Sequence, residues 1–557
     1  MAVPVLPRPF RVAQPDGTEL TLYPYGDEYT YRFETADGYR VVNEDDAYFY
    51  ASAGGERVLA HDPDRRGDAE NIFLASLPKA AESLTRSSSA DGVVTRSPIG
   101  AVTIHEGSPA IPVILVQFRD KRMTESDPKV SFTDRICRPA APSEVEVGKG
   151  SAYQYFADQS QNKYTPEFVI IGPVTLDRDA AYYGADGAGG ATDPNDGAMI
   201  ADAITKAIAG GEVSDWSKFD NDGDGMVDAV YIIYAGEGQH SRPQETDLVW
   251  PHSSSLAERG VESPAVGSLK FNAYSCSNEL LDGKPDGFGT FCHEFSHQLG
   301  LPDFYRTDGV TVTQFAMGSW SLMDYGSYEG GGFCPVGYRA LEKQRMGWAE
   351  VRELTEAETV VGLKSTAAGA SVLKVAKNAN EYYLVEVIDG KGWDSPCKAQ
   401  GLLITHVWGV GNDIWNNNTV NNSEPPRVFI IPADNDRTAL ISGKNDAEYE
   451  AGLAGDLYPS PDGNNELTDA SVPAADVQTG LSSKMGKPIT AIAYDAATGT
   501  VSFDFMGGAP SAVFAPENDP SRPLRYYRLD GSETTLPQHG FFLYENSDGT
   551  KGKMIKP

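Results

Sequence analysis

Residues 288–305 read "FGTFCHEFSHQLGLPDFY". His293 and His297 are four positions apart in this stretch, and Glu294 directly follows the first of them. On an α-helix, side chains four residues apart lie on one face about a turn apart, so both imidazoles can reach one metal ion. A helix with two unrelated core histidines is the alternative. Only eight histidines occur in the whole chain, which makes a coincidental match of this kind rare.

The residue that completes such a site is a separate question. Gly300 can adopt the left-handed conformation that ends a helix, and the chain can then turn back so that a residue six beyond His297 faces the metal. That residue is Asp303, whose carboxylate can bind zinc at about 2.0–2.2 Å. In the alternative, Asp303 only caps the loop, and Glu329 or Glu342 from a later helix is the third ligand.

Glu294 is placed to act on a water molecule at this site. Zinc lowers the pKa of a bound water towards ~7 and polarises a carbonyl group, and a neighbouring glutamate can serve as general base. Downstream, "FAMGSWSLMDYG" (315–326) contains Met323, the counterpart of the methionine turn that follows HExxHxxGxxH in metzincins. Tyr325 can reach the oxyanion of a tetrahedral intermediate, or it is an ordinary packing residue.

Strands and helices alternate around the motif. The apolar run at 110–118 predicts a strand, followed by a helix at 149–160, a strand at 167–176, a helix at 196–210 and a strand at 226–236. This alternation indicates an α/β layer with a mostly parallel sheet. Together with the histidine motif and the methionine turn, this layer leads us to expect a metzincin-like zinc protease catalytic domain at residues 96–349.

The two flanks of this domain are predicted to be all-β. Residues 1–95 form a β-rich segment of short strands between turn signals, and a Ser- and Gly-rich linker at 81–109, which carries Arg86 and Arg96, leads into the catalytic domain. Residues 350–507 contain apolar runs separated by Gly, Asn and Asp, which favour a β-sandwich. Residues 508–557 are predicted to be a short β tail.

A second metal site is predicted in "DNDGDGMVD" (220–228). Its acidic residues occupy positions 1, 3, 5 and 9 of a calcium loop, and the Met226 carbonyl occupies position 7. These residues are Asp220, Asp222, Asp224 and Asp228. Tyr231 stands where position 12 requires a glutamate, so an Asp/Gly turn without a metal is the alternative.

Composition excludes several partners. Lys plus Arg total 46 and Asp plus Glu total 79, so the net charge is −33, which argues against binding to nucleic acid or to an anionic membrane surface. No apolar run approaches the ~20 residues of a transmembrane helix. The sequence begins without a signal peptide, and we interpret this as an exported protein whose signal has been removed. Five cysteines allow one or two disulfides or plain buried thiols, and Cys292 could pair with Cys334.

The motifs together resemble a known family. "FCHEFSHQLGLPDFY", "WSLMDYGSY" and "RMGWAEV" are similar to the immune inhibitor A-type metallopeptidases, secreted bacterial enzymes of the metzincin kind. Residues 14–42 resemble that family's pro-segment, and "EYYLVEVIDGKGWD" with "GLLITHVW" resembles its β domain after the catalytic domain. The resemblance implies that His293, His297 and Asp303 are zinc ligands, Glu294 the base and Met323 the methionine of the turn. Residues 524–557 are similar to the sorting tails of secreted Bacteroidetes proteins, with an ordinary β module as the alternative.

We therefore expect a zinc endopeptidase that hydrolyses peptide bonds of proteins and is made as a latent zymogen, inhibited by its own pro-segment. It would be secreted or lie on the surface of a Gram-negative bacterium of the Bacteroidetes type. The expected cofactors are a catalytic Zn2+ and a structural Ca2+. A catalytically inactive adhesin or binding protein that retains the protease fold is the alternative from another functional class, and a zinc amidase is a third.

Overall fold

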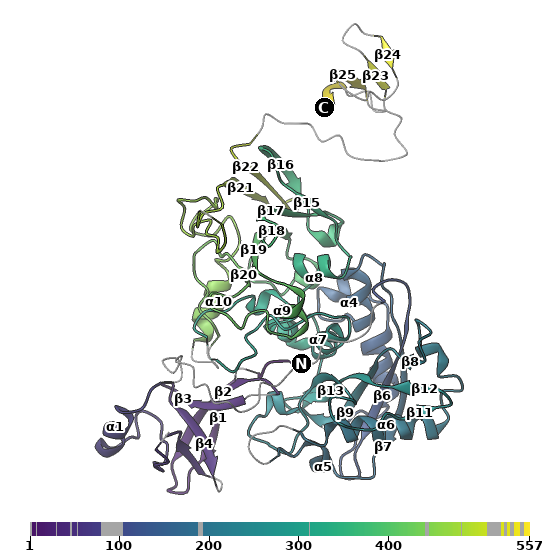
Figure 1. The fold of residues 1–557 in the computed structure, drawn as a ribbon, viewed down its shortest axis with the longest axis vertical. Helices are drawn as coiled ribbons and strands as arrows, with labels where there is room; N and C mark the ends of the chain where they lie inside the picture. Colours follow the sequence, from purple (N-terminus) through teal and green to yellow (C-terminus); the bar gives the residue numbers. More distant parts are fainter. Residues whose placement is uncertain are drawn as a thin grey trace.

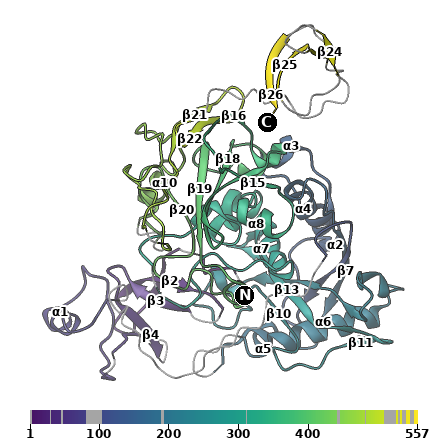
Figure 2. The ribbon, with the colours of Figure 1, turned by 45° about the horizontal axis from the view of Figure 1, so that its top comes forward.

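The computed structural model shows a mixed α/β chain with several separate sheets (Figures 1 and 2). It describes residues 3–508 except 7, 29–30, 45–46, 53, 80–103, 188–192, 311, 441–444 and 481, together with the strands of the last fifty residues. Most of the expected linker, including Arg86 and Arg96, thus lies outside the described residues.

The N-terminal segment forms one sheet of five antiparallel strands in chain order. Turn residues separate strands that alternate in burial, so that one face encloses a small core around Leu20, Leu22 and Phe33. The helix α1 (Asp68–Leu74) follows and lies at the outer end of this unit in Figure 1. The strands are β1 (Phe10–Ala13), β2 (Glu19–Gly26), β3 (Tyr31–Thr35), β4 (Arg40–Glu44) and β5 (Ala47–Tyr50).

The central unit is built on a sheet with the order β10-β13-β9-β6-β7, in which β14 also pairs with β13. The four strands from β13 to β7 are parallel, and β10 is an antiparallel edge strand. The two inner strands β6 and β9 are almost wholly buried apolar runs, as expected for strands covered on both faces of the sheet. The strands are β6 (Ala110–Gln117), β7 (Glu167–Thr175), β9 (Val230–Glu237), β10 (His252–Ser255), β13 (Ala273–Leu281) and β14 (Lys284–Pro285).

Helices connect these strands and cover the sheet. The predicted helices at 149–160 and 196–210 are confirmed as α4 (Ala152–Gln159) and α6 (Asp196–Gly210). The motif helix is α7 (Gly289–Gln298), which packs on β13 and β10 and lies between the sheet and the C-terminal half of the molecule in Figure 1. Shorter helices are α2 (Pro128–Phe132), α3 (Pro142–Val145), α5 (Ala180–Gly184) and α8 (Ala340–Arg345).

The prediction of one continuous strand at 226–236 is wrong. The run at 226–236 contains two strands, β8 (Met226–Val227) and β9, because the chain changes partners between them. β8 belongs to a small sheet with β11 (Ala265–Val266) and β12 (Leu269–Phe271), whereas β9 enters the central sheet. Backbone N–H of Asp228, between the two strands, donates to the Phe219 carbonyl and not to a sheet neighbour.

Residues 351–505 contain two further sheets that share one apolar core. One has the order β15-β17-β18-β19-β20 and the other the order β16-β22-β21. The first sheet also contributes Leu384, Leu403 and Val428 to the large core around α7, so this region and the central unit pack as one body. The strands are β15 (Val351–Glu353), β16 (Glu358–Leu363), β17 (Val372–Asn378), β18 (Glu381–Ile388), β19 (Gly401–Trp408), β20 (Val428–Ile430), β21 (Ile489–Asp495) and β22 (Thr500–Phe505), with helices α9 (Asn412–Asn416) and α10 (Asp446–Leu453).

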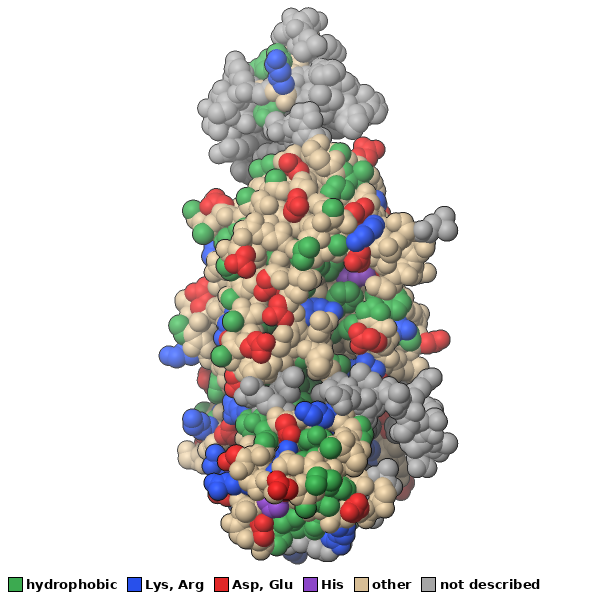
Figure 3. Space-filling model, turned by 90° about the vertical axis from the view of Figure 1, so that its left-hand side faces the viewer, with side chains coloured by type: hydrophobic (Ala, Val, Ile, Leu, Met, Phe, Trp, Pro, Cys, Tyr) green, Lys and Arg blue, Asp and Glu red, His purple; other side chains and the backbone are tan. Residues whose placement is uncertain are grey.

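The tail and the surface complete the description. The last strands form a sheet with the order β24-β23-β25-β26, at the top of Figure 1. They are β23 (Arg525–Tyr527), β24 (Glu533–Thr534), β25 (Gly540–Glu545) and β26 (Lys551–Lys556). Among the described residues, no helix is both long and apolar enough to cross a bilayer. Acidic side chains are spread over the face in Figure 3, with Lys and Arg between them.

Candidate metal centre

The helix α7 presents its two histidines to one point. His293 and His297 are fully buried, and their ring centroids lie 4.8 Å apart with the rings perpendicular. The helix can pack close to the segment that follows Trp320 because Gly289, at the start of the helix, has no side chain. A Cβ atom on Gly289 would lie 1.9 Å from the Ser327 carbonyl oxygen. The close approach brings the first histidine against the segment with Leu322 and Met323.

Backbone carbonyls hold both imidazoles in one orientation. Nδ1 of His293 lies 2.8 Å from the Leu322 carbonyl oxygen, and Nδ1 of His297 lies 2.7 Å from that of Leu301. A carbonyl only accepts hydrogen bonds, so each Nδ1 carries the proton and each Nε2 presents a lone pair. This arrangement is the one in which histidines bind metal ions, with the second nitrogen held by a hydrogen-bond acceptor.

The carboxylate of Asp303 meets these lone pairs. Its Oδ1 lies 3.2 Å from Nε2 of His293 and 3.3 Å from Nε2 of His297. All three atoms are buried and have no hydrogen-bond partner, since each of them is an acceptor. Three converging acceptors without a proton between them fit a bound cation, and one carboxylate with two imidazoles is a donor set that zinc favours.

A turn and a distant asparagine place Asp303. Gly300 has φ +91°, which ends α7 in the left-handed conformation and turns the chain back towards the histidines. Asn418, from the loop after α9, forms two hydrogen bonds with Asp303. Its Nδ2 donates to Oδ2 at 2.5 Å, and its Oδ1 accepts the Asp303 N–H at 2.7 Å. The alternative ligand Glu342 lies elsewhere, where it accepts hydrogen bonds from Ser321 and Arg339. In the described part of the chain, neither Glu329 nor Glu342 joins the cluster.

Met323 and Tyr325 lie in the segment that packs against α7. Met323 is fully buried, and its carbonyl oxygen accepts the Phe304 N–H at 2.7 Å, which ties the methionine segment to the residue after Asp303. Tyr325 lines a cavity next to the site. Burial raises its pKa, so the phenol stays protonated. Its predicted contact with an oxyanion stays a prediction.

Glu294 lies beside this cluster and is fully buried. Its Oε1 accepts the backbone N–H of Val3 at 2.7 Å, whereas its Oε2 has no hydrogen-bond partner. Burial raises the pKa of Glu294 well above its ordinary value, which makes the carboxylate more basic than an exposed one. The arrangement thus contains a metal-binding cluster with a free, basic carboxylate oxygen next to it.

Comparisons with known proteins agree with this geometry. Residues 143–348 match the family described as "Immune inhibitor A peptidase M6, catalytic domain". Residues 143–348 are therefore similar to the catalytic domain of the immune inhibitor A peptidases. Immune inhibitor A of Bacillus thuringiensis subsp. alesti is 30% identical over 245 residues, which are 38% of this chain and 34% of that protein. The pre-pro-metalloprotease PrtV of two Vibrio cholerae O1 strains is 27% identical over 216 residues, which are 35% of this chain and 23% of PrtV.

The M6 match covers the zinc motif and ends before the sheets of residues 351–505. The match between this chain and these relatives thus covers about a third or less of the length of the relatives. The relative PrtV is named a metalloprotease, and His293, His297 and Asp303 form a group that could hold a metal ion in this chain.

The N-terminal segment of the chain runs through the site. Besides the bond from Val3 to Glu294, the Val3 carbonyl accepts a hydrogen bond from the Trp250 indole at 3.2 Å. The Pro4 carbonyl accepts one from the Tyr328 hydroxyl at 2.6 Å. The backbone N–H of Leu6 donates to the His240 carbonyl at 2.7 Å. Residues 3–6 therefore occupy the space directly in front of the base, although they are about 290 positions away in the sequence.

The predicted calcium loop is only partly assembled. Asp220, Asp222 and Asp224 offer oxygens that lie within 4.8 Å of one another. Asp228 is turned to Asn221, whose backbone and side-chain N–H groups both donate to its Oδ2. The role of the loop in binding calcium, including the carbonyl of Met226, stays a prediction. All five cysteines are free, including Cys292 and Cys334.

Several residues around the site were not singled out in the sequence. Asn418 lies in "WNNNTVNNSE", where nothing distinguishes it from the neighbouring asparagines. Trp250 and Tyr328 contact the N-terminal segment, and neither of them was given a role in the sequence analysis. Tyr328 is three positions after Tyr325, in the run that resembles the family, which is the one signal that could have drawn attention to it.

Proposed function

We propose that this protein is a zinc-dependent endopeptidase that hydrolyses peptide bonds of proteins. The observation that carries the proposal is the convergence of the two Nε2 atoms and the Asp303 carboxylate, with the free oxygen of Glu294 beside them. A zinc ion bound there would polarise the scissile carbonyl and acidify a water molecule. The chain supplies the ligands His293, His297 and Asp303.

Glu294 supplies the proton transfers in this proposal. Its raised pKa suits a group that first takes a proton from the attacking water and then passes it to the leaving amine. Tyr325 and Tyr328 are hydroxyl donors close to the site. The substrate chain would pair with an edge strand of the central sheet, and β10 is an antiparallel edge that packs against α7.

We further propose that residues 1–95 are a pro-segment that keeps the enzyme latent. The space in front of Glu294 holds residues 3–6, so a substrate chain cannot reach the base while they remain. The N-terminal sheet is fastened to the catalytic unit outside the site as well, by a hydrogen bond of 2.6 Å from Tyr31 to Asp186 and by one from Arg32 to the Gly309 carbonyl. Cleavage in the linker at 81–109 would release the segment. The relative PrtV is named a pre-pro-metalloprotease, which is in line with such processing.

The remaining parts of the proposal concern stability and place of action. The three aspartates at 220–224 would hold a structural Ca2+ ion. Residues 96–349 would be the catalytic domain, 350–507 a β-sandwich that supports it, and 508–557 a tail that serves in sorting. The enzyme would act outside the cell or on its surface, in a Gram-negative bacterium of the Bacteroidetes type. The net charge of −33 makes nucleic acid an unsuitable partner.

Hydrolysis of casein tests the function. The full chain is cut in the linker by limited trypsin digestion, and the trypsin is then blocked with an inhibitor that spares metallopeptidases. We expect hydrolysis that a chelator abolishes and that Glu294→Ala reduces by at least about 1,000-fold while zinc still binds. Equal hydrolysis by wild type and Glu294→Ala would refute the role of the base. No hydrolysis by a zinc-loaded, cleaved wild type would favour the catalytically inactive binding protein.

A further inference from the structure

A cavity of about 320 Å3 opens beside the metal centre. Three of the segments that line it also contribute residues to the site or contact it, no more than two positions away in the sequence. Tyr305 follows Asp303, Tyr325 follows the methionine turn, and Pro4 is next to the residue that binds Glu294. A peptide chain lying across the centre therefore has this cavity beside it, and a volume of this size can hold one large side chain.

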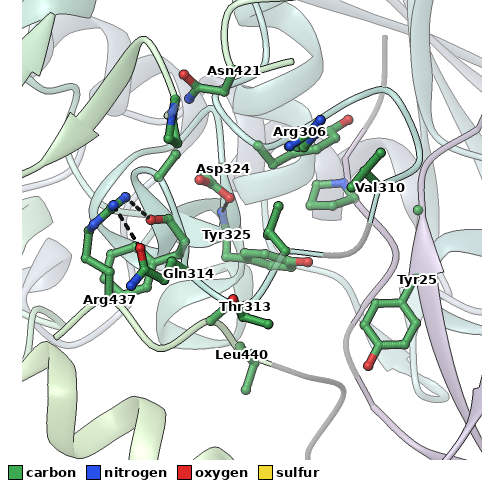
Figure 4. Close-up of a pocket in the computed structure, with 18 of the residues that line it drawn as sticks. Tyr25, Arg306, Val310, Thr313, Gln314, Asp324, Tyr325, Asn421, Arg437 and Leu440 are labelled. Atoms are coloured by element: carbon green, nitrogen blue, oxygen red, sulfur yellow. Dashed lines mark hydrogen bonds between the residues drawn. The ribbon is translucent and has the colours of Figure 1, made fainter. Parts of the chain in front are cut away.

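Two other parts of the molecule close the cavity on opposite sides. Figure 4 shows Tyr25 of the N-terminal sheet on one side, and Arg437 and Leu440 of the loop after β20 on the other, with Tyr325 between them. The side made by Pro4 and Tyr25 belongs to the proposed pro-segment and would leave with it. The side made by Arg437 and Leu440 stays and would face the substrate.

Most charged groups in the cavity already have partners. Arg306 forms ion pairs with Asp308 at 2.8 Å and with Glu424 at 3.7 Å. Both oxygens of Asp324 accept hydrogen bonds from backbone N–H groups, at 2.7–3.3 Å. These three carboxylates therefore present little free negative charge to a ligand. Arg32 lines the cavity too, but it is part of the N-terminal sheet.

Arg437 is the exception. Its guanidinium donates to the Phe315 carbonyl at 2.9 Å and to Oε1 of Gln314 at 3.1 Å, and both acceptors are neutral (Figure 4). It also lies over the Phe429 ring, 4.7 Å from the centroid. Within the described residues, no carboxylate forms an ion pair with it. Burial lowers its pKa, and the more distant carboxylates of Glu424 and Asp456 act in the opposite direction. A planar cation fixed by two neutral acceptors retains its attraction for a carboxylate.

We propose that Arg437 makes this cavity a subsite for a glutamate side chain of the substrate, close to the bond that is cut. The inference rests on the proposed peptidase function and adds the class of side chain that it prefers. A glutamate carboxylate could form charge-assisted hydrogen bonds with the guanidinium, and its methylene groups could pack on the apolar wall at Leu440. A glutamine of the same shape would lack the charge. The specificity of the catalytic domain would then depend on a residue outside the segment that matches the M6 family.

Cleavage of a peptide library tests this preference. The linker-cleaved full chain digests a mixture of peptides, and mass spectrometry identifies the residues that flank each cut. We expect glutamate to be enriched at one position next to the cut, and matched peptides with Glu or Gln there to differ by about 10-fold in kcat/KM. Absence of any acidic preference, in an enzyme whose cleavage a chelator abolishes, would overturn the inference and leave the proposed function standing.

Three variants attribute the preference to its source. Arg437→Gln should remove it, and Arg437→Lys, which keeps the charge, should retain part of it. Arg352→Gln is the matched control, because this arginine pairs with Glu358 in the same region and does not line the cavity. An unchanged preference in Arg437→Gln would overturn the inference.

A binding assay separates this inference from the function itself. Linker-cleaved Glu294→Ala protein is titrated with labelled Glu and Gln peptides, and fluorescence anisotropy gives the two dissociation constants. Tighter binding of the Glu peptide by about 10-fold, lost in the double variant with Arg437→Gln, supports the subsite even if the wild type hydrolyses nothing. Equal binding of the two peptides overturns it. Failure of the proposed function alone would appear as this binding preference without any chelator-sensitive hydrolysis.

Discussion

The two hydrogen bonds between Asn418 and Asp303 lead to a prediction that can be tested without changing a metal ligand. The change is Asn418→Gly, which deletes the side chain with both of its hydrogen bonds to Asp303. Glycine is the right replacement because Asn418 has φ +54°, in the left-handed region that an alanine would strain. The three residues of the metal cluster remain unchanged.

The size of the effect follows from the lost contacts. A hydrogen bond to a buried charged group contributes about 1.5–3 kcal/mol. At about 1.4 kcal/mol per factor of ten, losing the bond from Asn418 Nδ2 to the carboxylate corresponds to about 10- to 100-fold in metal affinity. Part of this loss is recovered if water takes the place of the amide, so we expect the lower half of the range.

Competition with a chromophoric zinc chelator measures the dissociation constant directly on the full chain. Asn422→Ala serves as the matched control, because Asn422 lies on the same loop and binds Thr307 but does not contact the cluster. We expect the zinc affinity of Asn418→Gly to fall at least about 10-fold and that of Asn422→Ala to stay within a factor of two. An unchanged affinity in Asn418→Gly, or an equal loss in the control, would refute the reasoning.

Three further predictions concern stability. Gly289→Ala should lower the free energy of unfolding by about 1–3 kcal/mol in urea titrations, since its Cβ would meet the Ser327 carbonyl at 1.9 Å; unaltered stability would contradict the packing of α7. Millimolar Ca2+ should raise the Tm of the wild type but not that of Asp222→Asn, and an equal rise in both would exclude the loop as the site. Burial lowers the pKa of His61, but hydrogen bonds to two carboxylates outweigh it and raise the pKa above 6.5. The stability that this residue adds to the N-terminal sheet is therefore fully present below pH 6.5 and is lost as the pH rises through the raised pKa. Calorimetry of His61→Gln should show that this part of the pH dependence of Tm is lost. A pH profile identical to that of the wild type would contradict the role of His61.

Local patterns predicted the parts of the site that are close together in the sequence. The spacing of His293 and His297, with the turn at Gly300, was enough to place Asp303 opposite the imidazoles, because a helix and one turn determine these positions. The helices α4 and α6 were predicted correctly because a helix, too, is determined by residues that are close together in the sequence. The break between β8 and β9 was missed because it depends on which strand pairs with which, and an apolar run carries no such information.

The remaining parts of the site depend on contacts between distant segments. Asn418 is 115 positions from Asp303, and Val3 is 291 positions from Glu294. Their side chains or backbone groups reach the centre only because the sheets of residues 351–505 and the N-terminal segment pack against α7 and its surroundings. Arg437 belongs to the same class, since its place in the cavity follows from the loop after β20. Such contacts leave no periodic signal in a single sequence.

The central claim is that His293, His297 and Asp303 together hold a zinc ion. Anomalous diffraction from crystals of the full chain, recorded on both sides of the zinc absorption edge, tests it most directly. The account predicts a single strong zinc peak about 2.0–2.2 Å from both Nε2 atoms and from an oxygen of Asp303. A crystal grown with zinc that shows no peak there, or a peak held by the histidines with Asp303 turned away, would contradict it.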